Sequence, residues 1–278
     1  MFDFTGKIAV VTGAGGTLCS VMAEKLAENG AAVVLVGRTE SKLIPVAEAI
    51  AAKGGKSAIK LCDVTDEEAV KRIASEIETD LGPADFLING AGGNHADATT
   101  KKEAYTGDEF APDHVPGFFD LDLSAVRRVM DVNTMGTVIP CRVFGEQMAK
   151  NGGGCIVNFA SMNSYKPLTK NPAYAMAKAA IYNFTEWLAA YLAPANVRVN
   201  AIAPGFFLNE RSRKFLTTPE GGLTARGERV MAHTPMKRFG EAEDIWGTMA
   251  YLLDNDASGF VTGVVVPVDG GFIAHPGV

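Results

Sequence analysis

The feature that most constrains the fold of this chain is an alternation of short apolar runs with segments of helical spacing. The runs consist mostly of Val, Ile, Leu, Ala and Phe, and each is closed by Gly, Asn, Asp or Pro. They occupy residues 8–12, 32–36, 57–62, 86–89, 155–159, 197–203 and 264–268. Nearly continuous apolar runs of this length are typical of strands covered on both faces, as in a parallel sheet. The pattern therefore predicts about seven parallel strands.

Segments with apolar residues at helical spacing lie between these runs, at residues 18–29, 66–81 and 173–192. The first is followed by Gly30, and glycine is a common C-terminal cap. The second is preceded by Thr65, and Glu68 three residues on completes the pattern of a capping box. Strand and helix alternate over residues 1–278 without an internal repeat or a change of composition. This predicts a single α/β domain with a doubly wound parallel sheet of the Rossmann type.

Two segments depart from this alternation. Residues 94–122 lack clear periodicity, and residues 205–240 follow the sixth predicted strand without a clear pattern. Both leave the sheet at the carboxyl ends of its strands, where ligands bind in open α/β sheets. We expect a substrate-side insertion at 94–122 and a lid at 205–240, although each could instead be a plain surface excursion.

Composition excludes several classes of protein. Hydrophobic residues make up 47% and charged residues 21%, as in globular enzymes, and a net charge of −6 disfavours a nucleic-acid partner. The N-terminal apolar run is too short for a signal peptide or a membrane span. The four cysteines are far apart and are expected to be reduced thiols in a cytoplasmic protein. The four histidines are scattered as well, so we expect no metal centre.

A glycine-rich segment, T-G-A-G-G-T-L-C at residues 12–19, joins the first predicted strand to the first predicted helix. Glycines there let backbone N–H groups approach a pyrophosphate at the helix N-terminus. The G-x-G-x-x-G fingerprint is met at the first two glycines but has Leu18 in third place, so the motif alone could be a structural turn. Its position between strand and helix favours a dinucleotide site that includes Gly13, Gly15, Gly16, Thr17 and Leu18.

The end of the second predicted strand bears on the choice of cofactor. An acidic residue there would bind a ribose 2′-hydroxyl, whereas an arginine would accommodate a 2′-phosphate. The strand ends at Gly37-Arg38, and Glu40 comes two residues too late. Arg38 therefore favours NADP(H), with NAD(H) as the second candidate. Alternatively, Arg38 stacks on the adenine or faces solvent.

Further cofactor contacts are expected where the third and fourth predicted strands end. Asp63, with Val64 beside it, could accept a hydrogen bond from the adenine amino group or merely cap a turn. Asn89, Ala91 and Gly92 place small residues where the backbone must pass close to the cofactor.

A second group of residues carries the chemistry. Tyr174 and Lys178 lie four apart in the predicted helix, and therefore on one face of it. Ser161 lies 13 residues before Tyr174, at the end of the fifth strand. Reduction of a ketone by hydride requires a proton for the new alkoxide, and a tyrosine beside an ammonium can supply it. A serine can orient the substrate oxygen. Ser161, Tyr174 and Lys178 are thus predicted to be catalytic, and coincidence is a poor alternative.

These motifs together resemble the short-chain dehydrogenase/reductases along essentially the full chain. The family patterns T-G-x-x-x-G-x-G and N-[NA]-A-G correspond to residues 12–19 and 89–92, and the family's Ser…Tyr-x-x-x-Lys to the three residues above. The resemblance implies that Asn133 holds a water of the proton relay. It also implies that Tyr174, Lys178, Pro204 and Gly205 contact the cofactor.

One departure from the family pattern concerns the cofactor loop. Thr17 and Cys19 stand at its second and third glycine positions. This leaves open how closely the helix approaches the pyrophosphate, and we expect Gly15 and Gly16 to compensate.

Within the family, several segments resemble the branch of D-mannonate oxidoreductases, or fructuronate reductases: residues 88–95, 161–163, 167–170, 203–208 and 233–236. That branch also carries an insertion like 94–122, and many of its members are expected to use NAD, with Asp in place of Gly37. The resemblance implies an NAD(P)-dependent enzyme that interconverts D-fructuronate, a keto-hexuronate, and D-mannonate, a hexonate. The alternatives are a reductase of another keto-polyol, a keto-gluconate or a 3-oxoacyl substrate. A non-catalytic cofactor-binding regulator is disfavoured, because such a protein would be expected to have lost Tyr174 or Lys178.

A sugar-acid substrate needs a cation for its carboxylate and amide donors for its hydroxyls. The candidates near the catalytic residues are Asn94, Asn163, Lys170, Asn171 and Arg211. Each could equally be an ordinary loop or surface residue. The family resemblance further implies a homotetramer, which apolar surface on the predicted helices 124–150 and 173–192 would support. These helices could instead simply be long core helices.

Overall fold

The computed structural model describes residues 2–275, except for the side chains of Glu210 and Arg211. Seven parallel strands form one sheet in the order β3-β2-β1-β4-β5-β6-β7. The strands are β1 Ile8–Thr12, β2 Ala32–Gly37, β3 Lys56–Leu61, β4 Phe86–Asn89, β5 Gly154–Phe159, β6 Val197–Pro204 and β7 Val265–Val268. The predicted Rossmann-type sheet is confirmed, and the strand order reverses between β1 and β4, which is where such sheets bind dinucleotides.

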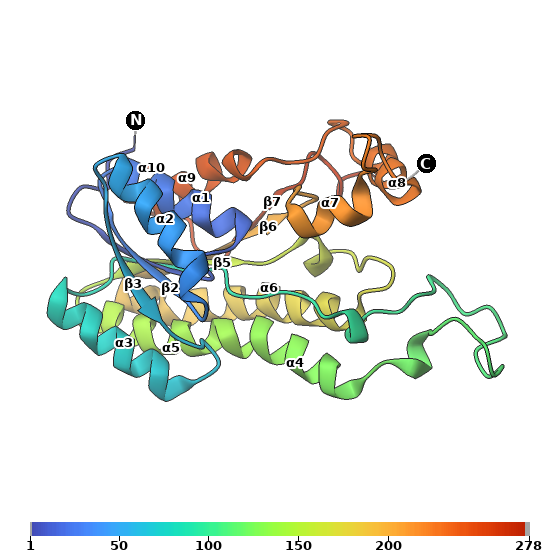
Figure 1. Ribbon diagram of the computed structural model, residues 1–278. Helices are drawn as coiled ribbons and strands as arrows, with labels where there is room; N and C mark the ends of the chain where they lie inside the picture. The colour runs from blue at the N-terminus through green and yellow to red at the C-terminus, as the bar shows by residue number, and fades with distance from the viewer. Residues whose placement is uncertain (1, 276–278) are drawn as a thin grey trace.

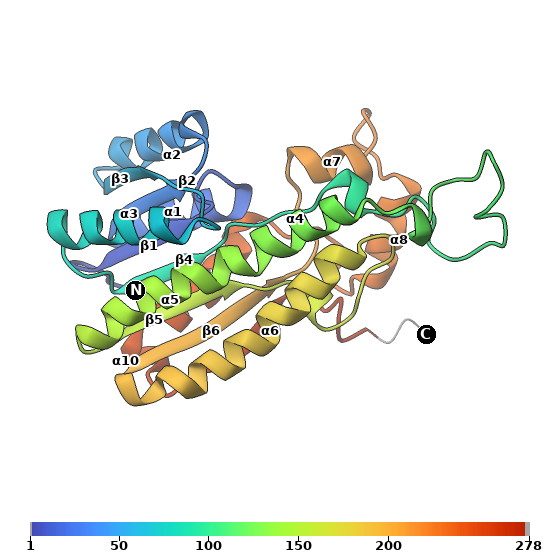
Figure 2. The ribbon, with the colours of Figure 1, turned by 90° about the horizontal axis from the view of Figure 1, so that it is seen from below.

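The helices lie on both sides of the sheet (Figures 1 and 2). They are α1 Thr17–Glu28, α2 Glu40–Ala52, α3 Glu67–Asp80, α4 Leu123–Asn133, α5 Met135–Lys150, α6 Pro172–Leu192, α7 Glu210–Leu216, α8 Ala225–His233, α9 Trp246–Leu253 and α10 Asn255–Ser258. Short 3₁₀ turns occur at Ala96–Ala98, Phe118–Asp120, Met162–Ser164, Ala193–Ala195 and Ala242–Ile245. None of the helices in the described part of the chain is long and apolar enough to span a membrane.

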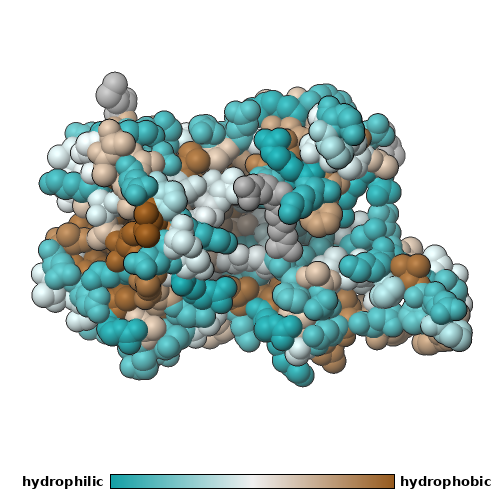
Figure 3. All heavy atoms as spheres, viewed as in Figure 1, coloured by the Kyte–Doolittle hydropathy of each residue, from teal (hydrophilic) through white to brown (hydrophobic). Residues whose placement is uncertain are grey.

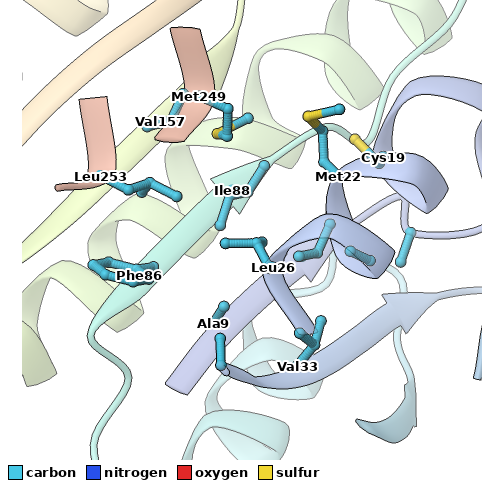
Figure 4. Packing of buried hydrophobic residues seen from close by; sticks show 14 of the residues in the cluster. Ala9, Cys19, Met22, Leu26, Val33, Phe86, Ile88, Val157, Met249 and Leu253 are labelled. Atoms are coloured by element: carbon cyan, nitrogen blue, oxygen red, sulfur yellow. The ribbon is translucent and has the colours of Figure 1, made fainter. Parts of the chain in front are cut away.

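Both faces of the central strand are buried, which explains its uninterrupted apolar sequence. Ala9 and Val11 of β1 pack into a cluster with α1, α2 and α9 (Figure 4). Ile8 and Val10, which point to the opposite face, pack with α3, α5 and α6. Successive residues of a strand alternate between faces, so a strand inside two layers of helices needs apolar residues at every position.

Three details of the predicted helices were wrong or missing. The N-cap of α3 is Asp66, which accepts a hydrogen bond from the Ala69 amide, and not Thr65. The Thr65 hydroxyl instead donates to Asp63 at 2.7 Å. The predicted helix 124–150 is divided at Thr134, whose hydroxyl donates to the Met130 carbonyl, a contact that often bends helices. Helix α2, which contains a proline, was not predicted at all.

The two irregular segments both extend from the carboxyl ends of the strands. Residues 94–122 project beyond the body of the molecule (Figures 1 and 2), and apolar atoms are visible on this projection in Figure 3. Its exposed aromatic residues are Tyr105, Phe110, Phe118 and Phe119. The second segment, between β6 and β7, forms α7 and α8. Both segments therefore begin next to the place where the predicted site residues gather.

Candidate active site

One cavity of about 310 Å³ at the carboxyl edge of the sheet contains most of the predicted site. The predicted catalytic residues Ser161, Tyr174, Lys178 and Asn133 all line it. The predicted cofactor residues that line it are Gly13, Gly16, Thr17, Leu18, Gly92, Pro204 and Gly205. Residues from α1 and from α6, far apart in sequence, thus face the same space.

The ends of β1 and β4 are fixed to each other beside this cavity. The Thr12 hydroxyl oxygen accepts hydrogen bonds from the backbone amides of Gly90, at 3.1 Å, and Ala91, at 3.2 Å. Gly13 has a φ of +64°, and a Cβ there would lie 2.8 Å from the Ala91 nitrogen. Glycine is therefore required where the chain turns from β1 into the loop that precedes α1.

Gly15 and Gly16 have separate roles. Gly16 lines the cavity and is the N-cap of α1, so the following amides of the helix are directed toward the cavity. A Cβ on Gly15 would lie 2.8 Å from the Cβ of Lys42, so this glycine lets α2 pack against the loop.

Several predicted cofactor residues do not line this cavity. Arg38 is 3.5 Å from Asp63, and both side chains are exposed. Asp63 also accepts hydrogen bonds from the Thr65 amide and hydroxyl. The hydrogen bond from the Thr65 amide is the main reason that the pKa of the Asp63 carboxyl group is lowered. Asn89 is buried and donates to Asn158 at 2.9 Å, so its side chain joins β4 to β5. Val64 is buried in a core cluster.

The predicted catalytic residues are held close together. The Lys178 ammonium lies 5.6 Å from the centre of the Tyr174 ring and donates to the Phe159 carbonyl at 2.7 Å. Burial lowers the pKa of Lys178 to about 8. Burial raises the pKa of Tyr174, and a hydrogen bond with Ser161 partly offsets this effect. A neighbouring ammonium and a hydroxyl partner are the groups that a tyrosine needs to exchange a proton.

Asn133 lies at the break between α4 and α5 and is completely buried. Its side-chain oxygen accepts from the Gly93 amide at 3.1 Å, and its amide donates to the Gly93 carbonyl at 2.7 Å. A Cβ on Gly92 would lie 2.5 Å from the same side-chain oxygen. Asn133 thus fixes the segment after β4 beside Lys178.

The predicted substrate residues Asn94, Asn163, Lys170 and Asn171 do not line the cavity. Asn163 donates to Ser161 through its backbone amide at 3.2 Å and accepts from the Leu168 amide. Asn94 donates to Asn171 at 2.8 Å, which ties the insertion to the start of α6. Lys170 lies 3.7 Å from Glu103 of the insertion. Arg211 lies in α7, and its side chain is outside the described residues.

Sequence reasoning missed Cys19, Phe207 and Asn209, which also line the cavity. Burial raises the pKa of Cys19 to about 12, so its thiol is neutral. The position of Cys19 in the family pattern was a usable signal, because the pattern has a glycine there. Phe207 and Asn209 follow Pro204-Gly205 closely, but no periodicity distinguishes them.

Comparisons with known proteins match nearly the whole chain. A family model described as enoyl-(acyl carrier protein) reductase matches residues 13–273. The uncharacterized oxidoreductase UxuB of Bacillus subtilis is 45% identical over 276 residues, which cover 99% of this chain and 98% of the relative. The 7alpha-hydroxysteroid dehydrogenase of Escherichia coli is 30% identical over 96% of this chain and 94% of the relative.

A solved structure from Haemophilus influenzae is similar over its full length. That protein is provisionally named a D-mannonate oxidoreductase and was solved with bound NAD. It is 43% identical to this chain, with a TM-score of 0.95, and the match covers 100% of this chain and 98% of that one. The relatives therefore share one fold, while their names span different substrates.

Proposed function

We propose that this chain, which belongs to the short-chain dehydrogenase/reductase family, interconverts a keto-hexuronate and a hexonate, with D-fructuronate and D-mannonate as the pair. The observation that carries the proposal is the single cavity in which Ser161, Tyr174 and Lys178 meet the glycine-rich loop of α1. The similarity to the Haemophilus protein supports the choice of substrate.

In the proposed mechanism, Tyr174 is the proton donor and acceptor. A nicotinamide dinucleotide, when bound, would supply or take up the hydride. Ser161 orients the substrate oxygen, and Tyr174 donates the proton that this oxygen needs when the ketone is reduced. In the oxidative direction the Lys178 ammonium, which lies 5.6 Å from the centre of the Tyr174 ring, would stabilise the phenolate of Tyr174, because a nearby positive charge favours the ionised form of a tyrosine.

We propose that Asn133 is a positioning residue and that it also holds the water of a proton relay. Its amide and carbonyl groups both bond to Gly93, so the side chain keeps one orientation beside the cavity. Such an orientation suits a residue that holds the segment after β4 in place while Lys178 exchanges protons.

For the cofactor we propose NADP(H), held by the proposed contacts of Gly13, Gly16 and Arg38. Arg38 is 69% exposed, and its partner in the described part of the chain, Asp63, lies at the long distance of 3.5 Å. The guanidinium is thus available to a 2′-phosphate, and neither Gly37 nor Arg38 offers a carboxylate to a 2′-hydroxyl. NAD(H) is the second candidate, because the Haemophilus protein was solved with it.

The insertion 94–122 and the lid 205–240 are proposed walls of the substrate site. Both segments begin beside the cavity. Asn163 donates to Ser161 of the cavity, Asn94 donates to Asn171, and Lys170 pairs with Glu103 of the insertion. We propose that the three asparagines, Lys170 and Arg211 provide contacts to the hydroxyls and carboxylate of the substrate.

We also propose a homotetramer in the cytoplasm. Exposed apolar side chains occur on α6, at Met176, Trp187 and Tyr191, and on α4, at Leu123. Large exposed apolar patches commonly mark interfaces. A sedimentation mass of a single chain, 29.3 kDa, at micromolar concentration would contradict the tetramer. The four unpaired cysteines are consistent with a reducing compartment.

A substrate panel tests the proposed function. Purified enzyme is given NADPH or NADH together with D-fructuronate, a keto-gluconate, a neutral ketose and a 3-oxoacyl thioester. The proposal predicts the highest kcat/KM with D-fructuronate. A higher value with the keto-gluconate or the thioester would assign the alternative substrates, and no turnover with any carbonyl compound would favour the regulator.

A further inference from the structure

A second hollow, of about 210 Å³, lies beside the candidate active site. Leu168 and Thr169, from the loop between Ser161 and Tyr174, form one side of it. Phe206, which directly follows Gly205 of the active-site cavity, forms another. The two hollows therefore share the segment that leaves β6, and the loop that lines the second hollow joins Ser161 to the helix that carries Tyr174.

The rest of the lining combines two arginines and a histidine of α8 with Glu103, Val230 and Phe272. Arg226 and Arg229 come from α8, three residues apart and therefore on one face of the helix, and His233 follows one turn later. Figure 2 places α8 next to the loop before α6 and the base of the insertion. Two guanidinium groups at one hollow of a chain with a net charge of −6 favour an anionic ligand there, although Glu103 of the same lining already faces one of them.

The two arginines differ in their partners. Arg226 is half-buried, and no hydrogen bond or ion pair links it to another residue in the described part of the chain. Arg229 is paired with Glu103 of the insertion at 2.8 Å, and Lys170 lies 3.7 Å from the same carboxylate. The Glu103 carboxylate thus lies between Arg229 of the lid and Lys170 of the loop before α6.

We propose that Arg226 and Arg229 bind the carboxylate of the substrate and that Glu103 is displaced from Arg229 when the substrate enters. This inference rests on the proposed function, because it assumes an anionic substrate at the neighbouring cavity. A guanidinium binds a carboxylate through paired, charge-assisted hydrogen bonds, which fix the orientation of the ligand. Arg226 supplies an unused group of this kind, and Arg229 supplies a second one.

Displacement of Glu103 from Arg229 requires little free energy. The side chains of Arg229 and Glu103 are 61% and 39% exposed, and ion pairs between such exposed groups contribute little net stability. A substrate carboxylate that also reaches Arg226 makes contacts that Glu103 does not make. A substrate carboxylate can therefore replace Glu103 at Arg229, whereas a neutral ketose cannot, and the enzyme would prefer acids over neutral ketoses.

The test compares three substitutions. Arg226→Gln and Arg229→Gln should each raise KM for D-fructuronate by about tenfold, with little change in kcat or in the Kd of NADPH. Glu103→Gln should lower this KM by about two- to fivefold, because it removes the internal competitor. Arg229→Lys, which keeps the charge, should recover part of the loss. If the Arg229–Glu103 pair were merely structural, Arg229→Gln and Glu103→Gln would change the KM for D-fructuronate in the same direction.

The chain offers a matched control in Arg142 and Glu67, an exposed ion pair at 3.0 Å between α5 and α3. Arg142→Gln and Glu67→Gln should leave KM unchanged. If the wild-type enzyme reduces D-fructuronate but both arginine variants keep its KM within about twofold, this inference is overturned and the proposed function stands. If the arginine variants instead weaken a different keto acid that the enzyme prefers, the inference stands and the proposed substrate falls. Turnover of neutral ketones alone would overturn both.

Discussion

The thiol of Cys19 occupies the space that a side chain at position 90 would need. A Cβ on Gly90 would lie 2.0 Å from the Sγ of Cys19 and 3.1 Å from the Thr12 carbonyl oxygen. The family pattern has glycine at the position of Cys19 and Asn or Ala at that of Gly90. In this chain the larger residue is therefore at the start of α1 and the glycine is after β4, which is the reverse of the family pattern. The close packing between the two segments is kept.

Gly90→Ala should therefore destabilise the protein, because overpacking a filled site costs about 1–3 kcal/mol. In the background of Cys19→Gly the same change should cost little, because the Sγ that blocks the site is gone. The reduced helix propensity of glycine in α1 lowers the stability of the Cys19→Gly single variant and of the double variant equally. Urea unfolding of the two single variants and the double variant gives the coupling free energy. Additive effects of the two changes would contradict the steric relationship.

Tyr174→Phe should lower kcat by about 10²- to 10⁴-fold, because it removes only the hydroxyl that exchanges the proton. The Kd of the cofactor, measured by fluorescence titration, should change little. Residual activity above about a tenth of the wild-type kcat would exclude Tyr174 as the general acid.

Lys178→Met should abolish turnover and raise stability at neutral pH. The pKa of Lys178 falls from its ordinary value of 10.5 to about 8, so the folded protein holds this proton less tightly than the unfolded chain. The cost of burying the ammonium, about 3 kcal/mol, is then fully present below pH 8 and disappears as the pH rises toward 10.5.

The free energies of unfolding of the wild type and of Lys178→Met should accordingly converge between pH 8 and pH 10.5. The lost hydrogen bond to the Phe159 carbonyl shifts the difference by a constant and does not affect its slope. A difference that is independent of pH would mean that Lys178 is not desolvated as the structure indicates.

Arg38→Ala should weaken NADPH binding and leave NADH binding nearly unchanged. The expected loss is about tenfold or more in Kd, as for removal of a charge-assisted contact to a phosphate. Titration of the wild type and the variant with both cofactors measures it. A wild type that prefers NADH at equal concentration would refute the inference from Gly37 and Arg38.

The central strands could be predicted because burial on both faces forces apolar residues at every position. The proximity of Tyr174 and Lys178 could be predicted because both residues lie on one helix, where residues four apart share a face. By contrast, α2 starts at Glu40 and contains Pro45, which interrupts the helical signal. Thr134 breaks a helix through a hydrogen bond to the Met130 carbonyl that spacing does not reveal.

Contacts between distant segments were beyond reach of the sequence. Lys170 was a candidate cation, but its ion pair with Glu103 depends on how the insertion folds back over the loop before α6. Arg226 and Arg229 carried no motif, and only the packing of α8 beside that loop brings them near the site. The expectation that Gly15 and Gly16 compensate for Thr17 and Cys19 concerned the pyrophosphate; the room for the Cys19 side chain itself comes from Gly90, which follows β4 and is distant in sequence.

The most direct test of the proposal that Tyr174 serves the reduction of D-fructuronate measures cofactor oxidation and identifies the product. Wild-type enzyme, NADPH and D-fructuronate are incubated together, NADPH oxidation is followed by absorbance, and the product is identified by NMR. We expect stoichiometric formation of D-mannonate by the wild type and almost none by Tyr174→Phe under the same conditions. Oxidation of NADPH by D-fructuronate at equal rates in both proteins, or no D-mannonate from the wild type, would contradict the proposal.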